Sequence, residues 1–434
     1  MSHGREAERV LAVSDLARVE GEGALRIVVK EGAVEDVALR IFEPPRFFEA
    51  LLRGRSYAEA PDITARICGI CPVAYQMSAC AAIEAACDTS VDERIVNLRR
   101  LLYCGEWIQS HALHVYLLHA PDFLGCQDAL ELAARDRPAV ERGLSLKRTG
   151  NLIMETIGGR AVHPVNVKVG GFYRAPATEA VAALADPLRR ARDEALVTVD
   201  WVSHFEFPDV EADYLFLALR GGDHYPIESG RIVSSTGIDT DAAGLAELVV
   251  EEQVERSTAL HARLEGRHAY LTGPLARYML NRDLMPEVAR AAAEDAGLAP
   301  VCRNPFRSIV VRAVELVVAC EEALRLVESY EPPDPPAADV VPRPGSGAGA
   351  TEAPRGLLLH RYELGSDGLI SSARIMPPTS QNQLTIESDL KRVVEGGLDL
   401  SDEELTWRCE QAVRNHDPCI SCAAHFLDVN VERR

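Results

Sequence analysis

Two short cysteine pairs carry the clearest chemistry in this sequence. Cys68 and Cys71 lie near its beginning in Arg-Ile-Cys-Gly-Ile-Cys, and Cys419 and Cys422 lie near its end in Asp-Pro-Cys-Ile-Ser-Cys. A Cys-x-x-Cys spacing lets one turn of backbone direct two sulfurs to one point, and four such sulfurs hold a soft or borderline metal ion. The pattern predicts a metal site, although the spacing alone names no metal.

Structural zinc is the commonest interpretation of two such pairs, and a redox dithiol is a second one. Zinc ribbons close small loops, whereas these pairs stand at opposite ends of the chain. In addition, Asp417 and His425 place groups that carry protons beside the second pair. A redox dithiol would need a thioredoxin-like strand-helix setting, which fits only loosely.

The rest of the chain has to fold so that the two pairs meet. Alternating apolar patterns predict small sheets and apolar periodicities predict long helices, so we expect a mainly α protein with small β-sheets (α+β). A central helical bundle would bring the two pairs together in a single domain spanning 1–434. We divide it into an N-terminal β-sheet (9–42), a helical core (43–330), a Pro/Gly-rich loop (331–350), a segment that carries the second pair (351–425) and a tail (426–434).

Composition excludes several classes of function. The 434 residues are 47% hydrophobic, and 46 basic against 66 acidic residues give a net charge of −20, which opposes binding to nucleic acid or to anionic lipid. The charged start lacks the apolar core of a secretory signal, and the apolar stretches are too short to span a bilayer. We therefore expect a cytoplasmic protein without membrane insertion, in which the 11 cysteines are thiols or metal ligands.

Two local patterns bear on metal binding. Pro72 opens a strong helix-forming stretch, which places Cys71 at the N-cap, where the helix dipole stabilises a thiolate. His111 and His114 are three residues apart on a long predicted helix and could bind a metal from one face. Such histidines are more often hydrogen-bonded packing residues, and that is the interpretation we adopt. No glycine pair is followed by a phosphate-binding pattern.

Several further motifs resemble, in the same order, those of the nickel-iron hydrogenase large subunit. Besides the two cysteine motifs, the resemblance rests on Arg18-Val-Glu-Gly21, Phe47-Phe-Glu49, Ser110-His-Ala-Leu-His114 with Asp122, Gly158-Gly-Arg-Ala-Val-His-Pro164, Glu352-Ala-Pro-Arg-Gly356 and Pro377-Pro-Thr379. The first cysteine motif and the length most resemble the cytoplasmic, bidirectional NAD(P)-linked hydrogenases, also called sulfhydrogenases. Tyr75 stands where the family commonly has histidine; a phenol still donates one hydrogen bond toward a bridging sulfur but is no base at neutral pH.

The resemblance implies reversible heterolytic cleavage of hydrogen at a nickel-iron site and a role for each matching residue. Nickel would be bound by Cys68, Cys71, Cys419 and Cys422, of which Cys71 and Cys422 would also bridge to an iron carrying cyanide and carbon monoxide. The catalytic residues would be Arg355 beside the open metal position, Asp122 and Asp417 as its partners, and Glu20 as carrier of protons from Cys419. Pro354, Pro378 and Thr379 would border the cofactor, and Glu49, His425 and the backbone carbonyl near Ile375 would form a magnesium site.

The resemblance also implies partners. The other seven cysteines stand singly, so we expect iron-sulfur clusters and flavin only in partner subunits, namely a small iron-sulfur subunit together with flavin/NAD(P) electron-transfer subunits. A maturation protease would cut after His425 once nickel is inserted. Two alternatives stay open. One is a structural zinc protein with four cysteine ligands, and the other is a complex I-like quinone-binding subunit, which shares the fold but lacks the nickel cysteines.

Overall fold

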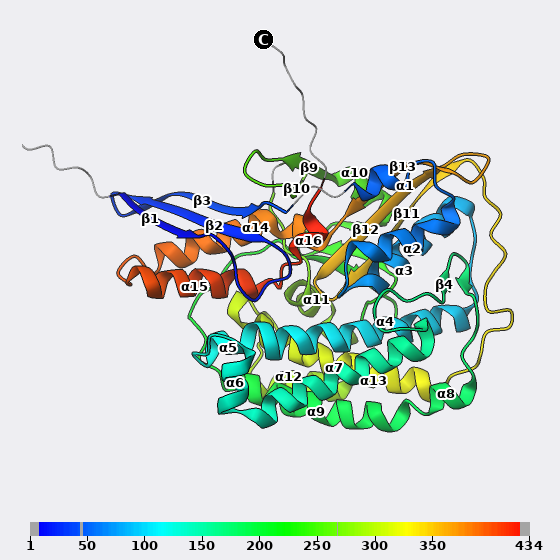
Figure 1. The fold of residues 1–434 in the computed structure, drawn as a ribbon, viewed down its shortest axis with the longest axis horizontal. Helices are drawn as coiled ribbons and strands as arrows, with labels where there is room; N and C mark the ends of the chain where they lie inside the picture. The colour runs from blue at the N-terminus through cyan, green and yellow to red at the C-terminus, as the bar shows by residue number, and fades with distance from the viewer. Residues whose placement is uncertain (1–7, 44–46, 267, 426–434) are drawn as a thin grey trace, which may run out of the picture.

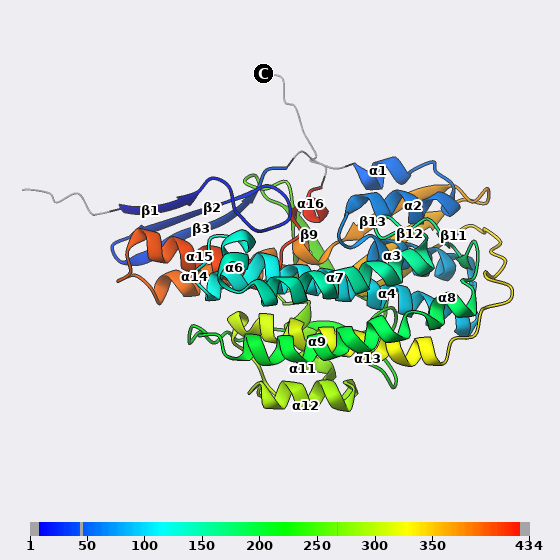
Figure 2. The ribbon, with the colours of Figure 1, turned by 60° about the horizontal axis from the view of Figure 1, so that its bottom comes forward.

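Four long helices packed along one another form the core of the computed structural model, which describes residues 8–43, 47–266 and 268–425. Figures 1 and 2 show this bundle in the lower half of the molecule. Its members are α4 (Glu93–Leu113), α7 (Arg137–Gly158), α9 (Ala185–Ser203) and α13 (Ser308–Glu328). Asp92 and Asp136 cap the N-termini of α4 and α7 with their side chains, which satisfies backbone N–H groups that lack a partner inside the helix.

The remaining helices surround this bundle and the metal-binding region. They are α1 (Phe48–Leu52), α2 (Ala60–Thr64), α3 (Pro72–Cys87), α5 (Ala120–Phe123), α6 (Ala129–Arg135), α8 (Thr178–Ala182), α10 (Ala242–Leu248), α11 (Pro274–Asn281), α12 (Glu287–Asp295), α14 (Pro378–Glu395), α15 (Asp402–Asn415) and α16 (Ile420–Ala423). The helical stretch 178–203 is divided into α8 and α9, and the long predicted helix that carries His111 and His114 ends in a π-helical turn at His114–His119. Among the described residues, we find no helix with both the length and the apolar character needed to cross a membrane.

The strands form small antiparallel sheets, as the sequence predicts. They are β1 (Glu8–Val13), β2 (Gly23–Lys30) and β3 (Ala33–Ile41) in one sheet; β4 (Val167–Lys168) and β5 (Gly171–Phe172); β6 (Leu217–Arg220), β7 (Arg231–Ser234) and β8 (Asp239–Thr240); β9 (Val249–Gln253) and β10 (Leu260–Leu264); and β11 (Gly345–Ala353), β12 (Gly356–Leu364) and β13 (Ile370–Met376). Glu31 and Gly32 form the turn between β2 and β3, and both have the positive φ of a tight hairpin. The prediction of a mainly helical fold with small sheets is confirmed.

The N-terminal sheet lies on helices from the other end of the chain. In Figure 1 the blue strands β1 to β3 lie over the orange and red helices α14 and α15. Apolar side chains from both sides form one buried cluster, including Leu25, Ile27, Leu39, Leu390 and Val413. This packing fixes the two ends of the chain against each other, which the predicted metal site requires.

The predicted loop 331–350 ends earlier than expected, because Gly345–Ala353 is strand β11. β11 lies directly against α3, and a Cβ at Gly349 would stand 2.5 Å from the backbone nitrogen of Ala82. Gly347 likewise faces the backbone of Ala82 and Ala86. The glycines therefore permit close packing of a strand on a helix, whereas the sequence composition indicated a flexible linker.

This contact predicts that Gly349→Ala destabilises the protein, by about 1–3 kcal/mol, because the added methyl group has to displace the backbone of α3. Thermal or urea unfolding measures the loss. Gly222→Ala is the matched control, since a Cβ there meets no atom within 4 Å. Equal stability of the two variants would contradict the close packing of β11 on α3.

Candidate metal centre

The two cysteine pairs meet in the interior of the protein. The Sγ atoms of Cys68 and Cys419 are 3.6 Å apart, and those of Cys71 and Cys422 are 3.8 Å apart. The metal-binding atoms of all four cysteines lie within 4.8 Å of one another, all four residues are buried, and none is in a disulfide. The structure thus brings one pair from each end of the chain to a single point that suits a metal ion.

Backbone geometry positions the first pair. Cys71 is the N-cap of α3, as predicted, and Pro72 is the first residue of the helix. The backbone N–H groups of Ile70 and Cys71 donate to Cys68 Sγ at 3.3 and 3.2 Å, which favours its thiolate form. The start of α3 is therefore a site where negative sulfur is stabilised.

Glu106 of α4 supports this helix start and was not identified from the sequence. Its carboxylate accepts hydrogen bonds from the backbone N–H of Val73 at 2.6 Å and of Ala74 at 3.1 Å. Burial raises the pKa of Glu106 well above its usual value, while the two N–H groups oppose that shift. An acid within an apolar helical run was the available signal, since a buried carboxylate requires donors.

The second pair is held by residues from both ends of the chain. Cys419 donates its backbone N–H to Thr379 Oγ1 at 2.9 Å, and Pro378 starts the helix α14 that carries Thr379. Ile420 donates its N–H to the backbone oxygen of Glu20 at 2.9 Å. Glu20 Oε2 lies 3.0 Å from Cys419 Sγ, so the predicted contact between this carboxylate and this sulfur is present.

Arg355 lies buried beside the second pair, in the turn between β11 and β12. Its Nε donates to the backbone oxygen of Asp417 at 2.9 Å and its Nη2 to Asp417 Oδ1 at 3.1 Å. Burial alone would lower the pKa of Arg355, but Asp417 and the nearby thiolates, Cys419 first among them, raise it well above the usual value. The guanidinium is therefore a permanent cation next to the sulfur cluster.

The expected pairing of Asp122 with Arg355 is wrong. Asp122 instead accepts from Arg414 Nε at 2.7 Å and Nη2 at 2.8 Å, and from Arg18 Nη2 at 2.6 Å. Arg414 and Arg18 are thus the cations that neutralise this buried carboxylate, and Asp122 connects α5 to α15 and to the loop before β2. Sequence spacing gave no means of choosing among three arginines that are distant along the chain.

His111 and His114 stay outside the sulfur cluster. His114 Nε2 is hydrogen-bonded to the backbone oxygen of Arg414 at 2.8 Å, and His111 Nε2 lies 3.0 Å from Glu315 Oε2. Both rings are buried, and burial lowers the pKa of each. They fit the expected packing role.

Glu49 and His425 lie together near the predicted magnesium position. His425 Nε2 is 3.0 Å from Glu49 Oε2, and the backbone N–H of Ile375 donates to Glu49 Oε1 at 2.7 Å. Glu251, which sequence reasoning missed, lines the same small cavity and acts electrostatically on this pair. Burial raises the pKa of Glu251, although Arg374 at 2.9 Å opposes the shift.

Unpaired buried donors around the sulfurs fit a metal group that carries small acceptor ligands. Among the described residues, Arg355 Nη1 and Tyr75 Oη are buried without a hydrogen-bond partner. Burial, followed by the charges of Cys422 and Cys71, raises the pKa of Tyr75 well above its usual value, so the phenol stays protonated and keeps a proton to donate. Buried donors usually have acceptors, and a group bound at the sulfurs that carries acceptor atoms of its own would supply them.

The pKa values of the cysteine side chains in this cluster are shifted in different directions. Those from Cys419, Cys422 and Cys71, in that order, hold the pKa of Cys68 well below its usual value. Burial raises the pKa of Cys419 and of Cys422. Thiolate is the form that binds metal, and the N–H groups of Ile70 and Cys71 that point at Cys68 Sγ favour that form.

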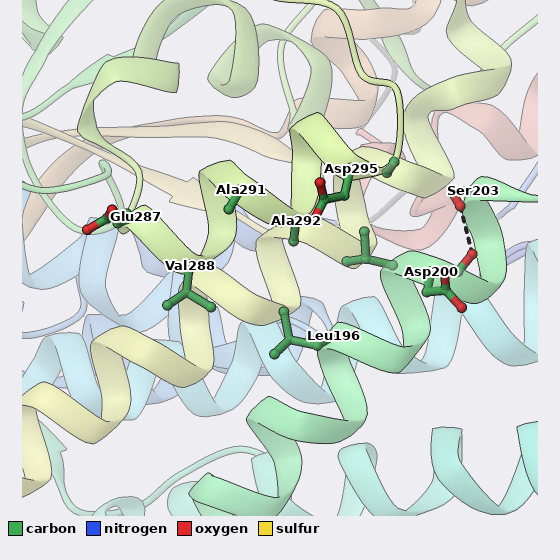
Figure 3. A pocket seen from close by; sticks show the side chains of 10 residues that line it. Leu196, Asp200, Ser203, Glu287, Val288, Ala291, Ala292 and Asp295 are labelled. Carbon is green, nitrogen blue, oxygen red and sulfur yellow. Dashed lines mark hydrogen bonds between the residues drawn. The ribbon is translucent and has the colours of Figure 1, made fainter.

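A larger hollow elsewhere is unrelated to this centre. It lies between α9 and α12 with a cavity volume of about 550 Å³, and Figure 3 shows Leu196 and Asp200 of α9 and Val288 and Asp295 of α12 among the side chains that line it. No cysteine is among the described residues that line it. Its size therefore does not identify it as the reactive site.

Comparison with known proteins assigns the chain to a family. A model of the nickel-dependent hydrogenase family matches residues 46–142. The alpha subunits of sulfhydrogenases 1 and 2 of Pyrococcus furiosus are 33% and 34% identical to the chain; each match covers 96% of it and 98% or 99% of the relative. A chain of an F420-non-reducing hydrogenase from Methanothermobacter marburgensis is 27% identical, over 96% of this chain and 95% of its own length.

Solved structures agree with this assignment. The NAD+-reducing [NiFe]-hydrogenase in its H2-reduced state superposes with a TM-score of 0.88 at 27% identity, covering 97% of this chain and 100% of that chain. The Ni-Fe-Se hydrogenase from D. vulgaris Hildenborough has a TM-score of 0.77 at 22% identity over 96% of this chain and 100% of that chain, which shows a shared fold.

The fold and the site together define a metalloprotein whose two ends build one buried centre of four cysteine sulfurs. The chain belongs to the nickel-dependent hydrogenase large-subunit family. The predicted family resemblance and fold class are confirmed.

Proposed function

We propose that the chain is the catalytic subunit of a nickel-iron hydrogenase that cleaves and forms H2 reversibly. The observation that carries the proposal is the meeting of four buried cysteine sulfurs, within 4.8 Å, in a chain of this family. Cys68 and Cys419 would be terminal ligands to nickel, and Cys71 and Cys422 would also bind the iron. Thiolates suit both metals because they are soft and bridge readily.

When bound, the nickel-iron group with its cyanide and carbon monoxide ligands supplies the metals that polarise H2 for heterolytic cleavage. Beside the sulfur cluster, Arg355 contributes a fixed positive charge and the donor Nη1, which has no hydrogen-bond partner among the described residues. Asp417 orients it through two contacts, and Pro354 precedes it in the turn. Thr379 presents its hydroxyl beside Cys419, where it can face a second acceptor ligand.

The proton of H2 leaves through Glu20 in this proposal. Glu20 Oε2 is 3.0 Å from Cys419 Sγ and 3.1 Å from the backbone nitrogen of Ser421. Glu20 is only partly buried, so this carboxylate connects the buried sulfur to the exterior.

Glu49 and His425, with the backbone of Ile375, are proposed as the magnesium site. Glu251 lines the same cavity and adds a second carboxylate to this set of ligands, and magnesium prefers oxygen ligands. In the structure the N–H of Ile375, and not its carbonyl, points to Glu49. The Glu49 and Glu251 carboxylates and the His425 imidazole would hold the magnesium ion.

Partner subunits would carry electrons away. Val162 and Val165 are exposed apolar side chains that flank His163 in the chain, and His163 Nδ1 lies 3.0 Å from Arg66 Nη1. His163 is hydrogen-bonded to the backbone of Cys68. This face fits a small iron-sulfur subunit. The similarity to an NAD+-reducing [NiFe]-hydrogenase supports NAD(P) as the electron partner, for which we propose flavin and NAD(P) subunits in a cytoplasmic assembly.

Metal analysis of the purified complex tests the function. We expect nickel in a 1:1 ratio to the chain and iron beyond that of the partner's clusters, with infrared bands of iron-bound cyanide and carbon monoxide. The Sγ separations of 3.6 and 3.8 Å also suit tetrahedral zinc, so a structural zinc protein is the specific competitor. Zinc alone, without infrared bands or H2 oxidation, would overturn the proposal.

Glu20→Gln tests the proton route. Glutamine keeps the size of the side chain but cannot accept and release a proton, so H2 oxidation and H/D exchange should fall by about 10²–10⁴-fold at unchanged nickel content. Glu22→Gln is the control, since Glu22 is exposed and its exchange removes the same charge two residues further along the chain. A Glu20→Gln enzyme as fast as the wild type would rule out this route.

Maturation is proposed to remove 426–434, which lie outside the described residues. The observation behind it is His425, whose ring contacts Glu49 in the metal-site region at the end of the described chain. Intact-mass spectrometry of active complex should give a chain ending at His425. An active chain that retains all nine tail residues would refute the cleavage.

A further inference from the structure

A buried arginine on α11 holds the turn that carries Arg355. Arg277 is 0% exposed. Its Nη1 donates to the backbone oxygen of Ala353 and its Nη2 to that of Pro354, both at 2.9 Å. These are the two carbonyls that immediately precede Arg355 in the chain.

Every N–H of this guanidinium has an acceptor. Nε and Nη2 donate to the two oxygens of Glu315 at 2.7 Å each, and Nη1 also contacts Glu352 Oε2 at 3.1 Å. With the two carbonyls this makes five partners for the five N–H groups of arginine. The ring of Trp107 lies under the guanidinium, 4.4 Å from its central carbon. Only a planar fork satisfies such a set, and the three donors of a lysine could not.

The residues just before α11 contact Arg355 itself and the residues that follow it in the chain. Thr272 Oγ1 accepts from the backbone N–H of Leu357 at 2.8 Å. Gly273 has φ +111°, and a Cβ there would stand 2.7 Å from the backbone oxygen of Arg355. The segment 272–277 therefore contacts the chain before, at and after Arg355.

The side chain of Arg355 has fewer fixed points than its backbone. Asp417 holds Nε and Nη2, whereas Nη1, the donor proposed to face the metal ligands, has no partner among the described residues. Asp417 fixes only the end of the side chain, so the place at which Nη1 is presented also depends on where the turn 353–357 puts the arginine backbone.

We propose that Arg277 is a positioning residue for Arg355, which acts by fixing the carbonyls of Ala353 and Pro354. The inference rests on the proposed function, because Arg277 would orient Arg355, and Arg355 acts on H2 only if that function is correct. A misplacement of about 1 Å at a reacting group costs on the order of 10²-fold in rate. Arg277 itself is proposed to touch neither substrate nor metal.

Arg277→Lys in the complete enzyme complex is the test, with Arg99→Lys as matched control. Arg99 is likewise buried in a two-point ion pair, with Glu84 at 2.9 and 2.6 Å, but its other contact is to the backbone oxygen of Lys168, far in the chain from Arg355. We expect both variants to lose thermal stability, and only Arg277→Lys to lose about 10–100-fold in kcat at unchanged nickel content. Hydrogen exchange at 353–357 should accelerate only in Arg277→Lys.

A double-mutant cycle separates positioning from general structural damage. If Arg277 acts through Arg355, adding Arg277→Lys to Arg355→Lys should change kcat by less than about twofold, because the aimed group is already lost. Multiplied losses, or a kcat loss in Arg99→Lys equal to that in Arg277→Lys, would overturn the inference.

Two further measurements test the role of Arg277 if Arg277→Lys does not fold or if the proposed function fails. If Arg277→Lys does not fold, Thr272→Val loosens the same turn from the other side, and faster exchange at 353–357 with a smaller loss of kcat is expected; unchanged exchange would count against the inference. If the wild type holds no nickel and oxidises no H2, the proposed function fails, while the exchange comparison still decides whether Arg277 fixes the turn.

Discussion

The concentration of four cysteine sulfurs at one buried point is the constraint on which the rest of this structure depends. Four thiolates within 4.8 Å of one another, as metal binding requires, would repel strongly in a medium of low dielectric constant. Nearby positive charge or hydrogen-bond donors therefore have to compensate each of them. The start of α3, the N–H groups directed at Cys68 and the cation Arg355 all supply such compensation, and a metal ion would supply most of it.

The buried groups that compensate the charge of the sulfurs need partners of their own. Arg355 needs Asp417, and the turn that carries it needs Arg277; Arg277 in turn requires Glu315 and Glu352. Burial raises the pKa of Glu352 to about 7, whereas Arg277 holds that of Glu315 at about 2 against the effect of burial. One guanidinium shared by two buried carboxylates thus neutralises one of them fully, and the second takes up a proton near neutral pH.

The sequence permitted prediction of what is local and of what the cysteines require. The helix start at Cys71, the hairpin at Glu31-Gly32 and the contact of Glu20 with Cys419 follow from spacing, turn residues and the family's motif order. The ion-pair partners of residues distant in the chain could not be predicted in this way. Any of several arginines could have paired with Asp122, and in the folded protein its partners are Arg414 and Arg18. The Gly/Ala-rich stretch of β11 was misjudged for a related reason: composition does not distinguish a flexible glycine from one pressed against α3.

The backbone at Asp417 shows how closely the arginine and the second cysteine pair depend on each other. Asp417 has φ 48°, a left-handed conformation that costs energy for any residue with a side chain, although Asp and Asn tolerate it best. Arg355 binds both its carbonyl and its carboxylate, and the backbone N–H of Asp417 donates to the backbone oxygen of Arg414 at 3.1 Å. Three contacts thus hold one strained residue two positions before Cys419. Because the strain is borne by the same bonds that aim Arg355, the guanidinium cannot move without releasing the turn that presents the cysteine.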